Sequence, residues 1–376
     1  MSPFAEGYPN RIAGPSRRAG ALRAARGIAL GGLALGVLAC ATGGGGGARS
    51  EPRPGAAGDG TGAGVPVAVI DPAPLGRAGA PTLLIAMPGS ANFADVRKSL
   101  VSEVQRNFNI HTLIVGPRTQ VGDLASAIRS VKPDCLVLMN NATMTLYRQY
   151  QLANPAASMP PAVLLMASFV EEVQPLIRRA TGIAYEVPGV TAFVNLRAVT
   201  TTPINRVGVV YRPAFRKFIE RQTILARREH VEIVAVSVPN DVGPGGLQDA
   251  LHDLAKNKKV DAIWMLNDNA LVRNVAFLDD AWRAETGDGQ LPLIVGVSNF
   301  VDPRAPLGTL AVVPDHEALG LQAGNLIYDL RDNGWHVEDH PVELPLSVKT
   351  VVDLSLVRNS FGLRPDALEH IDRALE

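Results

Sequence analysis

Short polar segments follow the apolar runs of this sequence, and their side chains are the best placed to hold a ligand. The clearest segment is Asn267-Asp268-Asn269, which comes directly after an apolar run. The remaining side chains stand singly at similar places, and they are Ser90, Asn92, Asn140, Asn141, Thr143 and Ser168. Amide, hydroxyl and carboxylate groups in such positions are typical of sites that orient a small polar molecule. Asn, Asp, Ser and Thr are also the preferred N-cap residues of helices, so each single position has a purely structural alternative.

A zwitterionic amino acid would use two kinds of partner in such a site. Its carboxylate fits the N-terminus of a helix, where free N–H groups and the helix dipole favour an anion, and helices are expected to begin near Ser90 and Asn141. Its ammonium group needs an acidic acceptor, for which Asp268 is the first candidate and Asp315 the second. Tyr185 lies near a predicted hinge and completes the set of candidate ligand-binding residues.

Catalytic chemistry has little support in the sequence. There is no GxSxG, Walker or HExxH motif. His336 and His340 are four residues apart, but Gly334 and Pro341 beside them favour a loop over a helical metal site. Lys plus Arg and Asp plus Glu are both 36, and aromatic residues make up 5%, which argues against a basic or stacking-rich nucleic-acid binder. We therefore expect no enzymatic activity, no metal, no cofactor and no nucleic-acid partner.

The elements that must position these residues repeat a strand–helix pattern in two halves. Short apolar runs predict strands at Thr82–Met87, Thr112–Val115, Cys135–Met139 and Ala162–Met166, and then at Val207–Tyr211, Glu232–Val236, Ala262–Leu266 and Leu293–Val297. Apolar residues at helical spacing lie between them, as in Phe93–Phe108 and Phe215–Arg228. Residues 132–141 parallel residues 259–268 at a constant offset of 127. The fold class predicted is α/β, with two doubly wound parallel-sheet lobes joined by a multi-strand hinge.

The N-terminal eighty residues have a different character. Arginines precede an apolar run over 27–38, which is too short to span a bilayer and suits a signal peptide. The run ends in Val37-Leu38-Ala39-Cys40, which resembles a bacterial lipobox, so Cys40 is the expected site of lipid attachment. Residues 41–80 contain 12 Gly and 5 Pro and predict a flexible tether, although the apolar patch over 65–70 could add an edge strand. Residues 1–39 hold five Arg and one Glu, so the rest of the chain carries a net charge of −4.

Several motifs in the body resemble those of the ABC-transporter substrate-binding lipoproteins with the type I periplasmic-binding-protein fold, whose better-known members are linked to tryptophan and other aromatic amino acids. The segment over 206–213 resembles IGVLYNP, and residues 260–269 are similar to VDAIYVPTDN. Thr181-Gly182-Ile183 resembles the turn NVTG, Pro314–Gly320 resembles VDYEELG, and residues 351–365 resemble VNLKTAKKLGLTIP. This chain departs from the family pattern at Ala167-Ser168-Phe169 and at His316, which puts an aromatic amino-acid ligand in doubt.

The resemblance and the pattern together predict the domain organisation and the function. Residues 1–39 form the signal peptide and 40–80 the lipidated cysteine and tether, while 81–183 with 309–340 make lobe 1 and 184–308 with 341–376 make lobe 2. The expected protein is a lipid-anchored monomer that faces the periplasm. It captures a small molecule and presents it to an ABC permease, and amino acids are among the expected ligands. The alternative is an outer-membrane lipoprotein of the same fold that acts as a regulatory or interaction module, an alternative favoured by Ala41 and the long tether.

Overall fold

The computed structural model describes residues 69–70, 78–302 and 307–376. Among these residues, the first sheet has six strands in the order β1-β3-β2-β4-β5-β6, and all of its pairs are parallel except β1 with β3. The strands are β1 (Val69–Ile70), β2 (Thr82–Met87), β3 (Asn109–Ile114), β4 (Cys135–Met139), β5 (Ala162–Leu165) and β6 (Ala180–Gly182). The helices that accompany it are α1 (Ala91–Val104), α2 (Val121–Val131), α3 (Asn141–Ala153), α4 (Val170–Val173) and α9 (His316–Asp332). This sheet and its helices are called lobe 1.

The second sheet, with its helices, is called lobe 2. Within the described ranges it has seven strands in the order β13-β12-β11-β10-β9-β7-β8. They are β7 (Arg206–Tyr211), β8 (Glu232–Ser237), β9 (Ala262–Trp264), β10 (Leu293–Val295), β11 (Leu310–Pro314), β12 (Val348–Asp353) and β13 (Arg373–Leu375). Its helices are α5 (Gly189–Val199), α6 (Arg216–Arg228), α7 (Pro244–His252), α8 (Ala284–Thr286) and α10 (Leu354–Leu356). The fold class predicted from the sequence is confirmed, with two antiparallel pairs among the parallel ones: β12 with β11 in lobe 2, and the edge strand β1 with β3 in lobe 1.

Alternate residues of each strand face opposite layers of helices, which explains why the strands read as continuous apolar runs. In lobe 1, Leu83 and Ile85 of β2 pack with α1 and α9, whereas Leu84 and Ala86 pack with α2 and α3. All four side chains are fully buried. A parallel strand covered on both faces has no solvent side, so polar alternation is absent from its sequence.

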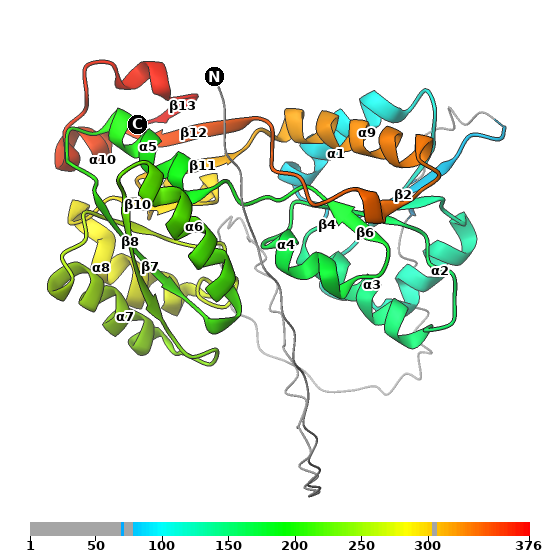
Figure 1. Cartoon of the computed structure of the whole chain (residues 1–376), viewed down its shortest axis with the longest axis horizontal. Coiled ribbons are helices and arrows are strands. Elements are labelled where there is room, and N and C mark those ends of the chain that lie inside the picture. Colours follow the sequence, from blue (N-terminus) through cyan, green and yellow to red (C-terminus); the bar gives the residue numbers. More distant parts are fainter. Residues whose placement is uncertain (1–68, 71–77, 303–306) are drawn as a thin grey trace, which may run out of the picture. The chain divides into compact units, whose positions relative to one another are not determined.

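Helices α1 and α9 lie alongside each other on one face of lobe 1, although more than two hundred residues separate them in the chain (Figure 1). Gly320 makes this close packing possible. A Cβ atom at this position would lie 2.6 Å from the Val96 carbonyl oxygen and 2.8 Å from the Leu100 nitrogen. The backbones of the two helices therefore touch at a point where no side chain fits.

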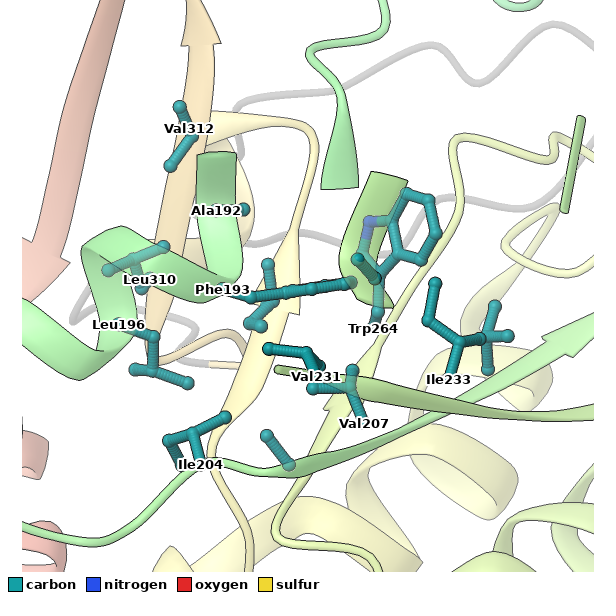
Figure 2. Close-up of a cluster of buried hydrophobic side chains, with 14 of the residues drawn as sticks. Ala192, Phe193, Leu196, Ile204, Val207, Val231, Ile233, Trp264, Leu310 and Val312 are labelled. Atoms are coloured by element: carbon teal, nitrogen blue, oxygen red, sulfur yellow. The ribbon is translucent and has the colours of Figure 1, made fainter. Parts of the chain in front are cut away.

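The core of lobe 2 includes two large aromatic side chains close to the carboxyl end of β9. Phe193 of α5 extends toward Trp264 of β9 (Figure 2), with ring centroids 5.5 Å apart and an interplanar angle of 83°. Such an edge-to-face arrangement is favourable beyond the area it buries. Val312 and Leu310 of β11 belong to the same cluster and connect these rings to the centre of the sheet.

The chain passes between the lobes three times within the described residues. The segments are 183–188 after β6, Asp315 after β11, and 340–347 before β12. They hydrogen-bond to one another: the Ala184 N–H donates to the Glu343 carbonyl (2.8 Å), and the Asp315 N–H donates to the Ser347 carbonyl (2.9 Å). The sequence placed the second crossing at residue 309, but β11 pairs with β10 and β12 and belongs to lobe 2, so this crossing falls at Asp315.

Candidate functional site

A small cavity lies where the first crossing meets the carboxyl ends of lobe 2 strands and the start of α4 in lobe 1. Phe169, which follows β5, contributes from lobe 1, and Tyr185 and Glu186 contribute from the crossing. Trp264 and Asn267 contribute from the end of β9. The enclosed volume is ≈ 20 Å³, which is room for about one water-sized group. Ligands of open α/β sheets bind outside the carboxyl ends of the strands, so this is the expected place for a binding site.

Glu186 is the electrostatic centre of this cavity. Its Oε1 atom is buried and has no hydrogen-bond partner among the described residues. Burial raises the pKa of Glu186 to about 7, and the Glu171 carboxylate acts in the same direction. The backbone N–H groups of Phe169 and Glu186 and the Asn267 amide favour the charged form, but they do not outweigh the loss of hydration. Near neutral pH this carboxyl is therefore poised between its acid and its anion.

The pH dependence of stability should reveal this buried carboxyl. Because the pKa of Glu186 is raised above its ordinary 4.5, the folded protein holds this proton more tightly than the unfolded chain. The stabilisation is fully present below the ordinary value and is lost as pH rises through about 7. Relative to Glu186→Gln, the wild type should lose on the order of 3 kcal/mol of unfolding free energy over this window. Parallel profiles for the two proteins in chemical denaturation would contradict the assignment.

Asp268 lies one residue beyond the cavity and is already paired. Its two carboxylate oxygens accept from Arg212 Nε (2.6 Å) and Nη2 (2.7 Å). Oδ1 also accepts from the Ala270 N–H at 3.0 Å, and the side chain is only 2% exposed. The pair fixes the loop after β9 and hence the position of Asn267. The role of Asp268 as an ammonium acceptor remains a prediction, and in this structure Arg212 already supplies its cation.

A stack of aromatic rings continues from this ion pair into lobe 1. The Arg212 guanidinium lies 5.4 Å from the ring centre of Phe215, and that ring stacks on Phe169 with centroids 3.9 Å apart. Phe169 has a left-handed backbone with φ of 58°, an unusual conformation for a bulky residue. Arg221 of α6 also bridges to Glu171 (2.6 Å) and Glu172 (3.1 Å) of α4. The two lobes are thus in contact through this stack and these ion pairs.

A second, larger cavity of ≈ 550 Å³ adjoins the second crossing. Its lining includes Asn92 and Ser99 of α1, together with Asp315, His316 and Lys349. Asp315 caps α9 by accepting from the Glu317 N–H (3.1 Å) and pairs with Lys349 at 2.9 Å. Burial acts to raise the pKa of Asp315, but Lys349 and the N–H groups of Glu317 and Ala318 together lower it. Small-molecule sites typically occupy about 300–1,000 Å³, so this cavity has room for a ligand body.

A hydrogen bond links one lining residue of each cavity. Tyr185 lines the smaller cavity and His316 the larger one, and Tyr185 Oη lies 3.0 Å from His316 Nε2. Burial raises the pKa of Tyr185 to about 12 and lowers the pKa of His316. Both groups are therefore neutral at physiological pH, and the phenol and the ring nitrogen share one hydrogen bond.

The structure gathers only part of the candidate set around the cavities. Tyr185 and Asn267 line the smaller one, and Asn92 and Asp315 line the larger one. Asn140, Asn141, Thr143 and Ser168 instead make local hydrogen bonds. Asn140 caps α3 by accepting from the Thr143 N–H, and the Thr143 hydroxyl donates to the Met139 carbonyl. Asn141 exchanges two hydrogen bonds with the backbone of Ser168. Ser90 and Asn269 are exposed. A ligand role for these residues stays a prediction.

Sequence reasoning missed the residue with the most unusual environment. Glu186 follows Tyr185 directly, and a carboxylate inside a predicted crossing between lobes was an available signal. No comparable signal in the sequence marked the residues around it, which are Phe169, Arg212 and Trp264. An aromatic residue after a strand and an arginine in a Tyr-Arg-Pro turn look the same in sequence whether they line a site or solvent.

In the part of the chain that the structure describes, no group of three or more His, Cys, Asp or Glu side chains could hold a metal ion. None of the helices in that part is long and apolar enough to cross a membrane. Cys135, the first residue of the strand predicted over Cys135–Met139, is fully buried in β4. The signal peptide, Cys40 and most of the predicted tether lie outside the described residues, although β1 at 69–70 adds the predicted edge strand.

Compared by sequence, the chain matches no family model and no curated protein. Compared by structure, it is similar to an ABC domain in complex with L-Trp from Streptococcus pneumonia, with 15% identity, a TM-score of 0.51, and coverage of 78% of this chain and 100% of that one. It is also similar to a conserved domain protein from Vibrio cholerae (16%, TM-score 0.53, covering 78% and 99%). A ligand-free, open substrate-binding protein with adhesive properties from Clostridium difficile is similar as well (14%, TM-score 0.57, covering 79% and 99%). These likenesses show the fold of the type I periplasmic solute-binding proteins.

Proposed function

We propose that this chain is an extracytoplasmic solute-binding protein that captures one small molecule between its lobes for an ABC importer. The observation that carries the proposal is the cavity at the first crossing, because strand ends of lobe 2, Phe169 of lobe 1 and the crossing itself line it. A ligand held there would touch both lobes, so it would favour whichever lobe arrangement gives it more contacts. The structural relatives support the same assignment, since the Streptococcus pneumonia protein is described in complex with L-Trp.

The location proposed is the bacterial envelope, with the protein monomeric and held to the membrane through Cys40. The lipobox-like Val37-Leu38-Ala39-Cys40 supports lipid attachment, and two or more acyl chains anchor a protein stably. The Gly- and Pro-rich tether would let the folded lobes stand away from the bilayer. An alternative role, as a regulatory module on the outer membrane, is favoured by Ala41 after the lipid cysteine. Membrane fractionation distinguishes them, because recovery in the outer membrane alone would exclude direct delivery to an inner-membrane permease.

Ligand capture is tested by thermal unfolding of the protein after any bound ligand has been stripped by unfolding and refolding. The protein is the chain from residue 41 onward, and the panel is the twenty L-amino acids, putrescine, purine bases, simple sugars and small amides. We expect at least one compound to raise Tm in a concentration-dependent way, because a ligand that binds only the folded state stabilises it. A flat response across the whole panel would contradict the proposed function.

A further inference from the structure

Glu186 presents an unsatisfied acceptor inside an otherwise apolar hollow. Apart from Glu186, Asn267 and the Tyr185 hydroxyl, the side chains of this cavity are apolar, and they include Phe169, Trp264, Ile294 and Val312. Oε1 of Glu186 is buried there without a hydrogen-bond partner among the described residues. A buried polar atom without a partner is unfavourable by several times the net contribution of an ordinary hydrogen bond, so folded proteins rarely keep one.

The cations of this region are already engaged. Arg212 pairs with Asp268, Arg221 pairs with Glu171 and Glu172, and Lys349 pairs with Asp315. The Glu171 carboxylate on α4 repels the charge of Glu186, and the neighbouring Tyr185 is uncharged near neutral pH. The surroundings therefore favour an incoming positive charge and supply none to the carboxyl.

We infer that Glu186 is the recognition carboxylate of the binding site and accepts the protonated amine of the ligand. This inference rests on the proposed function and names its substrate class: small molecules that carry a primary ammonium group, α-amino acids among them. The ≈ 20 Å³ of enclosed space admits an ammonium head group and little more, so the body of the ligand extends outward from the hollow. The Asn267 amide oxygen beside it can accept a second N–H of the same group.

Binding would change the protonation of the site. A carboxylic acid that meets an ammonium ion gives up its proton to the buffer, and the carboxylate and the ammonium then form a charge-assisted pair. Burial raises the pKa of Glu186 to about 7, so unliganded molecules are partly protonated near neutral pH. Binding of an ammonium ion should therefore release protons near neutral pH, and fewer of them as the pH rises.

The test compares matched ligands and matched variants. Within the panel above, any compound that raises Tm should carry a primary amine, and the sugars and purines should have no effect. For the amine that raises Tm most, the analogue lacking the amino group should bind the wild type at least ten times more weakly, as expected for a lost charged hydrogen bond. Calorimetry of that amine in two buffers of different ionisation enthalpy should show proton release near neutral pH that diminishes as the pH is raised.

Glu186→Gln keeps the shape of the side chain and removes its charge, so it should fold and bind the amine about 10- to 100-fold more weakly, without proton release. Glu229→Gln is the control, since Glu229 is exposed at the end of α6, and it should bind like the wild type. Equal affinity for the deaminated analogue, or unchanged binding by Glu186→Gln, would overturn the inference. Tm shifts with sugars or purines alone would overturn it and leave ligand capture standing, whereas no shift with any compound would remove the proposed function itself.

Discussion

Replacing Arg212 by methionine should destabilise the protein by about 3–5 kcal/mol, because it leaves the Asp268 carboxylate buried without its cation. The Asp268 side chain is 2% exposed, and its carboxylate accepts two hydrogen bonds from the Arg212 guanidinium. The substitution also removes the cation over the Phe215 ring, which stacks on Phe169. The measurement is the unfolding free energy from urea titration.

The double variant Arg212→Met with Asp268→Asn provides the control for this prediction. Asparagine keeps an oxygen for the Ala270 N–H and has no charge to leave unpaired. We expect the double variant to be more stable than Arg212→Met alone, so the two substitutions should couple strongly in a double-mutant cycle. Additive effects would show that the pair contributes no interaction energy and would contradict its role in fixing the loop after β9.

Phe193→Ala should have an effect of similar size, about 3–5 kcal/mol, through loss of buried contacts and the cavity left behind. Phe193 is fully buried and packs edge-to-face against Trp264, which lines the smaller cavity (Figure 2). Gly189, the first residue of α5, lies so close to Trp264 that an added Cβ would be 2.9 Å from its ring. The Trp264 indole is therefore held by Phe193 and by the Gly189 backbone. Loss of the Phe193 ring should also weaken binding of the amine that raises Tm most.

Phe193→Leu distinguishes these two consequences. Leucine keeps most of the apolar volume, so the stability loss should be smaller than for alanine. If Trp264 needs the aromatic edge for its position, ligand affinity should still fall in this variant, as titration calorimetry would measure. Affinity equal to that of the wild type in both variants would contradict the proposal that Trp264 bounds the ligand site.

The sequence predicted the strands well because burial on both faces leaves an unambiguous pattern. Cys135–Met139 and Thr82–Met87 coincide with β4 and β2 residue for residue. Helical spacing was found over Phe215–Arg228, and α6 occupies Arg216–Arg228. Where a segment is apolar throughout and lies between helices, the parallel sheet is almost the only environment that accommodates it.

The placement of β11 was harder to predict, since its sequence carries no information about its neighbours. Leu310–Pro314 is apolar and would suit either lobe, and its assignment depends on pairing with β10 and with the distant β12. The antiparallel direction of β12 has the same origin, because the chain returns from lobe 1 through 340–347 before it pairs. Such choices are decided by tertiary contacts that local composition does not report.

The candidate site was only partly predictable for a related reason. Asn140 and Thr143 have the residue types of a ligand site, and in the structure they cap and brace α3. Polar residues at helix starts serve both purposes, so residue type alone does not separate them. Glu186 owes its character to burial between segments that are distant in sequence, Phe169 and Asn267, which becomes visible only in three dimensions.

Capture of a small molecule between two lobes is the central claim, and small-angle X-ray scattering of the stripped protein tests it most directly. The scattering of the protein is measured without ligand, and again with a saturating concentration of the panel compound that raises Tm most. The account predicts a smaller radius of gyration with the compound, because a ligand that contacts both lobes favours their closed arrangement. An unchanged radius of gyration at saturation would contradict binding between the lobes.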